Sequence, residues 1–336
     1  MKYIKDKYGY TLLFDEKSGI AIRGDFEGKN IFWKQSGPEL LDISITNYCD
    51  KGCDFCYRQS NVNGKFMSIQ LFKKIILDAQ KLGVYQIAIG GGNPNQHPHF
   101  IDFLKISRLH GIVPSYTTNG IGMTNDIYYA TKQFAGAVAV SWYKPYELPE
   151  SVIRKCFDLK IPINIHFVLN NDNIKQAYEL INNDIVNFVN AIIFLTYKPV
   201  GKVKHNVLTD SHQLKSLLLT LTSYDRCKIG FDSCMISHLV KHDYDIDPES
   251  IDFCEAARFS AFISEEGLMY PCSFMSASPK FGCDLSHSSM IDIWKNSEVF
   301  VKLRDRLHSP NDKCIGCSHY ISCHGGCPFF DINCSR

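Results

Sequence analysis

The amino-acid sequence predicts an α/β protein with a mainly parallel sheet, open or barrel-like, followed by a smaller domain organised by metal. Two observations predict this arrangement. Short apolar strands alternate with helical segments six times between about residues 37 and 225. Beyond residue 225 the periodicity weakens, and ten of the 14 cysteines lie from Cys227 onward. In alternating folds of this kind, the chemistry lies at the carboxyl ends of the strands.

Each expected strand is a short run of apolar residues, and each expected helix repeats its apolar residues at helical spacing. We expect strands over residues 41–45, 86–89, 112–116, 137–140, 163–169 and 191–195, and helices over 69–82 and 100–110. Ahead of them, a strand-rich lead-in has strands over 10–14 and 20–22 on either side of a hairpin turn. The expected domains are 1–36, 37–225 and 226–336.

Composition excludes several classes of protein. The chain has 336 residues, of which 45% are hydrophobic and 21% charged, as is typical of a globular protein. A net charge of +1 provides no basic field for nucleic acid. No apolar run reaches the roughly 18 residues of a membrane span, and the first residues lack an apolar signal region. We therefore expect a cytoplasmic protein with no nucleic-acid and no membrane partner.

The cysteine content is the one unusual feature of the composition. Secreted proteins use many cysteines as disulfides, but such proteins are usually short and carry a signal peptide. In a reducing cytosol, clustered thiols more often bind metal. Metal binding is therefore the preferred interpretation of the clusters, and disulfides are the alternative.

Three cysteines follow the expected strand at 41–45 with the spacing C-x-x-x-C-x-x-C, namely Cys49, Cys53 and Cys56. Three thiolates hold three corners of a four-iron cluster and leave one iron free for a substrate or cofactor. Gly52 permits a tight loop around such a cluster. A zinc loop is the alternative, although zinc sites usually pair two C-x-x-C units.

The triad resembles the radical S-adenosylmethionine (SAM) superfamily in its spacing, in the aromatic Phe55 before the third cysteine and in its position after the first barrel strand. The run Gly90-Gly91-Gly92-Asn93-Pro94 resembles that family's glycine-rich motif, with Asn93 where glutamate is commoner. The resemblance implies a partial (β/α)6 barrel and a set of cofactor-binding residues. These are Phe55, Gly90, Gly91, Gly92, Asn93, Thr118, Ser141 and Tyr197. The alternative is that the glycines form only a turn and the polar residues satisfy loop backbone.

The later cysteines resemble the SPASM extension of radical SAM enzymes, in which G-x4-C precedes C-x2-C-x5-C-x3-C. The seven matching positions are Cys254, Cys272, Cys314, Cys317, Cys323, Cys327 and Cys334. The resemblance implies two auxiliary [4Fe–4S] clusters. One set of ligands is Cys314, Cys317, Cys323 and Cys334. The other set is Cys254, Cys272 and Cys327, completed by Cys234, by Cys283 or by no protein ligand. A structural zinc ribbon is the alternative.

Two cysteines, Cys156 and Cys227, fit neither array. A buried free cysteine behaves as a small apolar residue, which is the simplest interpretation of both. The alternative is that one of them donates a hydrogen atom to a radical, as in some peptide epimerases of the superfamily.

The resemblance also implies a mechanism. A [4Fe–4S] cluster on the catalytic residues Cys49, Cys53 and Cys56 would cleave SAM reductively to a 5′-deoxyadenosyl radical. That radical would abstract hydrogen from a peptide substrate. The leading hypothesis is a maturase that installs a cross-link (thioether, C–C or C–O) or an epimerised centre in a ribosomally made precursor peptide. A flavodoxin or ferredoxin-type protein would supply electrons, and residues 1–36 would dock a leader peptide by strand addition.

Two other functions stay open at this point. The first is an anaerobic sulfatase-maturing enzyme, which oxidises cysteine or serine to formylglycine and typically needs a catalytic acid that the sequence does not locate. The second is a non-catalytic iron–sulfur electron-transfer protein. Failure to cleave SAM would favour the second.

Overall fold

The structure is a computed structural model that describes the 336-residue chain except residues 26, 28–30, 242–243, 245–251, 331 and 333–336. Its main feature is a ten-stranded sheet in the order β10-β9-β8-β7-β6-β5-β4-β11-β12-β13. Its strands are β4 (Leu40–Thr46), β5 (Gln86–Gly91), β6 (Val113–Thr118), β7 (Val138–Ser141), β8 (Ile163–Leu169), β9 (Ala191–Thr196), β10 (Lys228–Phe231), β11 (Ser260–Ile263), β12 (Leu268–Tyr270) and β13 (Cys283–Asp284).

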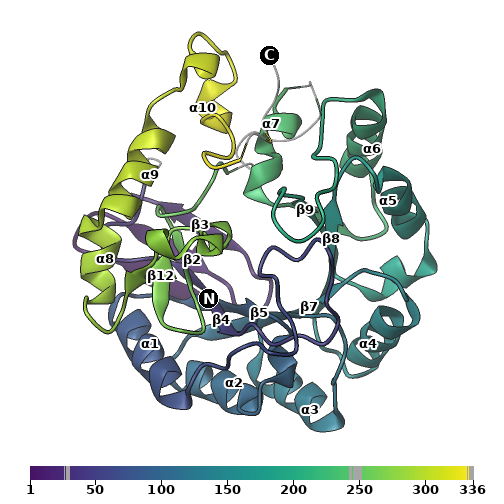
Figure 1. The fold of residues 1–336 in the computed structure, drawn as a ribbon, viewed down its shortest axis with the longest axis horizontal. Coiled ribbons are helices and arrows are strands. Elements are labelled where there is room, and N and C mark those ends of the chain that lie inside the picture. The colour runs from purple at the N-terminus through teal and green to yellow at the C-terminus, as the bar shows by residue number, and fades with distance from the viewer. Residues whose placement is uncertain (26, 28–30, 242–243, 245–251, 331, 333–336) are drawn as a thin grey trace.

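Helices lie around this curved sheet, most of them along its outer face (Figure 1). They are α1 (Ile69–Lys81), α2 (Phe100–Leu109), α3 (Asn125–Phe134), α4 (Glu147–Asp158), α5 (Ile174–Ile181), α6 (His212–Thr222), α7 (Ile236–Leu239), α8 (Met290–Asn296), α9 (Glu298–His308) and α10 (Tyr320–Cys323). In α1, Ser68 caps the first turn by accepting a hydrogen bond from the Leu71 amide. The buried face of α1 carries Phe72, Ile75, Ile76 and Ala79 at helical spacing.

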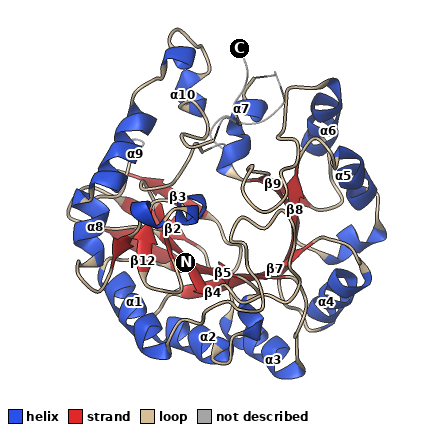
Figure 2. Cartoon of the chain, viewed as in Figure 1, coloured by secondary structure: helices blue, strands red, loops and turns tan. Residues whose placement is uncertain are grey.

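All strand pairs from β10 to β11 are parallel, and the two pairs beyond β11 are antiparallel. Figure 2 shows the strands lining the inner side of the ring of helices. The six strands and two helices expected from the sequence are confirmed, each within two residues of the expected bounds. The alternation of β4 to β9 with helices explains why the sheet is parallel.

The sheet also continues beyond residue 225, where the sequence predicts a domain boundary. Strand β10 pairs with β9 at one edge, and β11 pairs with β4 at the other. Both strands have only four residues, too few for a periodic pattern to reveal them. A division at 225 consequently leaves four strands of the main sheet, β10 to β13, in the C-terminal part.

The N-terminal residues form a separate three-stranded antiparallel sheet in the order β1-β2-β3. Its strands are β1 (Lys2–Lys5), β2 (Thr11–Phe14) and β3 (Ala21–Gly24). The expected hairpin of β2 and β3 is confirmed, and β1 is an additional strand. Tyr10, Leu12 and Phe14 pack against Tyr85 and Phe259 of the main body. Among the described residues, no helix is long and apolar enough to cross a membrane.

Candidate active site

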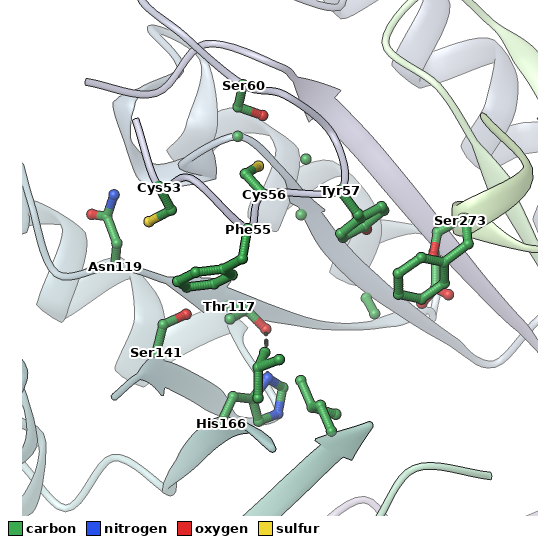
Figure 3. Close-up of a pocket in the computed structure, with 18 of the residues that line it drawn as sticks. Cys53, Phe55, Cys56, Tyr57, Ser60, Thr117, Asn119, Ser141, His166 and Ser273 are labelled. Atoms are coloured by element: carbon green, nitrogen blue, oxygen red, sulfur yellow. Dashed lines mark hydrogen bonds between the residues drawn. The ribbon is translucent and has the colours of Figure 1, made fainter. Parts of the chain in front are cut away.

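A cavity of about 440 Å³ lies at the carboxyl ends of the parallel strands. Figure 3 labels ten of its residues, which come from the loop after β4, from β6 and the residue after it, from β7, from β8 and from η5 (Ser273–Ala277). The predicted site residues in its wall are Cys49, Cys53, Phe55, Cys56, Gly90, Gly91, Gly92, Thr118, Ser141 and Tyr197. Their gathering follows from topology, because the carboxyl ends of neighbouring parallel strands meet at one edge of the sheet.

The three triad cysteines are free thiols in one wall of this cavity. Gly52 adopts a left-handed conformation with φ of 61°, which allows the loop to turn between Cys49 and Cys53. Asn119 Nδ2 donates a hydrogen bond to Cys49 Sγ at 3.4 Å. Burial raises the pKa of Cys53 to about 11. Three thiols beside open space fit a four-iron cluster with one free corner, because thiolates are the usual ligands of such clusters.

The segment after β9 holds the triad loop in place. The backbone amides of Lys202 and Val203 both donate to Asp54 O, at 3.0 and 3.1 Å. Gly201 has a φ of +121°, and a Cβ there would lie 3.0 Å from the Phe55 carbonyl carbon. A side chain at position 201 would crowd the backbone of the triad loop, so glycine is favoured there. The same close approach of the two segments places Tyr197 in the cavity wall with the triad.

The glycine-rich run ends β5 where the chain after β4 crosses it. A Cβ on Gly91, which has a φ of +117°, would lie 2.0 Å from Thr46 O, and one on Gly92 would lie 2.0 Å from Tyr48 O. The Gly92 amide donates to Thr46 O at 2.6 Å. Glycine is therefore required here by backbone contact between β5 and the start of the triad loop.

Asn93 differs from its neighbours, because its side chain is buried outside the described cavity wall. Its Oδ1 accepts hydrogen bonds from Thr118 Oγ1 at 3.0 Å and from the Asn119 amide at 3.2 Å. Its Nδ2 donates to Ile121 O at 2.9 Å. The sequence prediction gave Asn93 a cofactor-binding role. In the structure these three hydrogen bonds occupy the amide and shape the loop that presents Asn119 to Cys49.

Among the titratable residues of the cavity wall, Asp42 and His166 were missed by the sequence prediction. Asp42 lies on β4, and His166 lies on β8 with its Nδ1 3.3 Å from Thr117 Oγ1. Burial, with the charge of Glu255 in addition, raises the pKa of Asp42 to about 7. Burial lowers the pKa of His166 to about 4, so its ring is neutral at pH 7. The sequence signal that could have identified Asp42 and His166 is a titratable residue inside a mainly apolar strand.

The raised pKa of Asp42 predicts a pH-dependent effect of Asp42→Asn on stability. The folded protein holds the Asp42 proton more tightly than the unfolded chain, so this group lowers the free energy of unfolding as pH rises from 3.8 to about 7. At pH 8 the variant should gain on the order of 1–4 kcal/mol, and at pH 5.5 clearly less. Denaturant unfolding of the cluster-free protein at both pH values measures this difference, with Asp126→Asn on the exposed side of α3 as control. Equal gains at both values would contradict the assignment.

The later cysteines fall into two groups. Cys314, Cys317 and Cys323 line a second cavity of about 350 Å³, beside Ser237 of α7. In the other group, the Cys254 thiol interacts electrostatically with the thiols of Cys272 and Cys327. Cys334 lies outside the described residues. The grouping matches the two ligand sets that the sequence implies, and the assignment of these cysteines as ligands stays a prediction.

Of the two unassigned cysteines, Cys156 on α4 is fully buried in the main apolar core. Burial raises the pKa of the Cys156 thiol to about 12. Cys227 is half-buried and precedes β10. Neither is in the described wall of the cavity at the triad. Both positions agree with a role as small apolar residues.

Comparison with known proteins agrees with this site. The model of the radical SAM superfamily matches residues 43–140, and that of the SPASM iron–sulfur cluster-binding domain matches residues 254–318. The chain is 26% identical over 314 residues to mycofactocin maturase MftC of Mycobacterium tuberculosis, covering 86% of this chain and 78% of that protein. It is 21% identical over 321 residues to the PqqA peptide cyclase of Bradyrhizobium diazoefficiens, covering 86% and 81%.

Solved structures share the fold. Streptococcus suis SuiB bound to S-adenosylmethionine has a TM-score of 0.73 at 19% identity, covering 87% of this chain and 73% of that one. SuiB bound to precursor peptide SuiA has a TM-score of 0.72 at 19% identity, covering 87% and 72%. Native anSMEcpe with bound AdoMet has a TM-score of 0.66 at 15% identity, covering 86% and 89%.

The fold, the thiol-lined cavity and these matches define the chain as a radical SAM enzyme. Within that superfamily it carries a C-terminal SPASM domain, and its cofactors are [4Fe–4S] clusters and S-adenosylmethionine. The expected partial barrel is therefore confirmed as the fold of the catalytic part, with β4 to β9 as its strands.

Proposed function

We propose that the chain modifies a ribosomally made precursor peptide, introducing a cross-link or an epimerised centre. The observation that carries this proposal is similarity along 86% of the chain to a maturase and to a peptide cyclase. The fold shared with SuiB, which has been solved with its precursor peptide, agrees with it. The cavity at the triad supplies room for a substrate side chain beside the cofactor.

In this proposal, Cys49, Cys53 and Cys56 hold the catalytic cluster, and residues 37–225 form the catalytic domain. When bound, the cluster and SAM supply a radical that removes hydrogen from an unactivated carbon. The protein must then exclude water and hold the target carbon close, because such a radical is indiscriminate. Aromatic and apolar side chains of the cavity wall suit that task, including Phe55, Tyr57, Tyr143, Phe262 and Phe274. A flavodoxin or ferredoxin-type protein is the proposed electron donor.

The polar groups of the cavity would orient the peptide. His166 is neutral and half-buried, and it offers a ring nitrogen to a backbone amide or carbonyl. Asp42, with a pKa near 7, changes between hydrogen-bond donor and acceptor around neutral pH. Both side chains reach the cavity from strands of the sheet, and groups on rigid elements keep a substrate in a fixed position.

The test is anaerobic incubation with SAM, a reductant and, as candidate substrates, synthetic peptides from short reading frames next to the gene. A cross-link removes two hydrogen atoms from the peptide, and epimerisation in D2O introduces deuterium at one carbon, so mass spectrometry detects both. We expect one of these changes together with 5′-deoxyadenosine. Formation of 5′-deoxyadenosine without any change in the peptide would overturn the peptide substrate and leave the enzyme class intact.

The N-terminal sheet offers a surface for the leader part of such a peptide. Tyr3, Leu13 and Ile22 are paired across its three strands, with exposed fractions of 62%, 41% and 63%. They form an apolar stripe on the face opposite the one that packs on the main body. β1 and β3 are both edge strands of this sheet, and an edge strand pairs readily with an added extended peptide.

Changing this apolar stripe to serine should weaken binding of the full precursor. Burial of one apolar side chain contributes about 1.5–3 kcal/mol, so the combined Tyr3→Ser, Leu13→Ser and Ile22→Ser variant should raise the Kd at least about tenfold. Calorimetry with the full precursor measures this, and Tyr129→Ser, an equally exposed aromatic on α3, is the control. An unchanged Kd would show that the leader binds elsewhere.

A second candidate function is oxidation of cysteine or serine to formylglycine. The observation that favours it is the carboxyl group of Asp42 in the cavity, because that reaction needs an acid–base group. Peptides that carry a single cysteine or serine distinguish the two functions. Formation of an aldehyde, trapped with a hydrazine, would support this second function over peptide cross-linking.

A further inference from the structure

Cys234 occupies a position that the SPASM match does not reach. It lies in η3 (Ser233–Met235), directly after β10, whereas the match begins at residue 254. The hydrogen bond from the Asp232 amide to Phe194 O, at 3.1 Å, fixes this turn to the end of β9. The main sheet therefore determines where the Cys234 side chain lies.

The Cys234 thiol lies among the three cysteines of the first auxiliary group. It hydrogen-bonds with the thiol of Cys327. The Cys234 thiol also interacts electrostatically with the thiols of Cys254 and Cys272. Those two thiols interact with each other as well. The four interacting thiols come from segments far apart in the sequence: the turn after β10, the residues before β11, the segment after β12 and the loop after α10.

Cys283, the other candidate for this group, has different neighbours. It lies on β13, opposite Met269 of β12, and the group that its thiol interacts with is Ser297 at the start of α9. The sequence left the choice open between Cys234, Cys283 and no fourth protein ligand. The contacts of the two thiols distinguish them.

Charge around Cys234 also suits a thiolate ligand. Lys198 is buried, donates to Asp232 Oδ2 at 2.6 Å and contacts the Cys234 thiol through a hydrogen bond. A cation in hydrogen-bond contact stabilises a thiolate and the negative charge of a thiolate-ligated cluster. Lys198 and Asp232 also line the cavity at the triad. The Lys198–Asp232 ion pair therefore contacts both the Cys234 thiol and the substrate cavity.

We propose that Cys234 is the fourth ligand of the first auxiliary cluster, together with Cys254, Cys272 and Cys327. Four thiolates occupy all four irons of a cubane, so this cluster has no free iron for a substrate atom. It then serves to carry electrons to or from the neighbouring cavity. This inference rests on the SPASM assignment and is independent of which substrate the enzyme modifies.

The experiment uses protein in which Cys49, Cys53 and Cys56 are all alanine, so that only auxiliary clusters contribute. Cys234→Ser and its matched control Cys283→Ser are compared with this parent after anaerobic reconstitution. Iron, acid-labile sulfide and the electron paramagnetic resonance (EPR) spectrum are measured, with circular dichroism as a check of folding. We expect about 8 irons in the parent and in Cys283→Ser, and a loss of between one and about four irons in Cys234→Ser with a changed spectrum.

Full iron content and an unchanged spectrum in Cys234→Ser would overturn the proposal, as would iron loss in Cys283→Ser alone. Zinc without sulfide in the parent would overturn it too. If Cys234→Ser does not fold, Cys234→Asp carries the test, because a carboxylate can replace a thiolate as a ligand. The aspartate variant should keep its iron and show a shifted spectrum, and a spectrum identical to the parent would overturn the proposal. No peptide is present, so the result is separate from that of the peptide assay.

Discussion

Combined replacement of Cys49, Cys53 and Cys56 by alanine should lower the iron content from about 12 to about 8 per chain, the difference of one four-iron cluster. The same variant should form no 5′-deoxyadenosine from SAM. Both effects follow from the position of the three thiols in one wall of the cavity, where they are the proposed ligands of the catalytic cluster. Iron and sulfide analysis and chromatography of the nucleoside products measure them after anaerobic reconstitution.

The control for the triad is Cys227→Ser, a half-buried cysteine outside the wall of the cavity. It should keep about 12 irons and the SAM cleavage of the unmodified protein. A fall from about 8 to about 4 irons in the triad variant would mean a single auxiliary cluster. SAM cleavage that survives in the triad variant would place the catalytic cluster elsewhere.

Replacement of Glu265 by alanine should lower the free energy of unfolding by about 3–5 kcal/mol, because it leaves a buried guanidinium without its partner. Glu265 Oε2 accepts hydrogen bonds from Arg58 NH2 at 2.6 Å and from Ser44 Oγ at 2.7 Å. The side chains of Arg58 and Glu265 are only 8% and 4% exposed. Arg58 lies two residues after Cys56, so this network joins the triad loop to the turn between β11 and β12.

The neighbouring residue provides a matched control. Glu266 pairs with Lys65, and both side chains are more than half exposed. Because solvent screens that pair, Glu266→Ala should change the free energy of unfolding by at most about 1 kcal/mol. Urea unfolding of both variants without clusters makes the comparison, and similar losses would refute the structural importance of the Arg58–Glu265 pair.

Local patterns in the sequence were sufficient for most of the fold. The strands from β4 to β9 are apolar runs between helices with clear periodicity, and their order in the sheet follows from the alternation. β10 and β11 were not predicted, because their sheet positions depend on pairing with β9 and β4, which are distant from them in the sequence. Such long-range pairing leaves little trace in a four-residue segment.

The same distinction applies to the site. The triad and the glycines were predicted, because each is a compact motif with a local conformational reason. Asp42 and His166 were not predicted, because strand register and sheet curvature determine which strand side chains point into the cavity. Asn93 was assigned to the cofactor from its place in a motif, whereas its amide is occupied by the loop after β6. Cys234 lies near the other cysteines only in the folded chain, so no local motif indicates its role.

The parallel pairing of β11 with β4 has a consequence for electron tunnelling. β4 leads into the triad loop, and β11 is followed by β12 and Cys272. Tunnelling rates fall steeply with distance, so a redox enzyme benefits from a fixed gap between its centres. Here a backbone hydrogen-bond ladder, rather than a linker, sets the distance between the triad and the auxiliary cysteines. The pairing therefore ties the two groups of cysteines to neighbouring strands of one sheet.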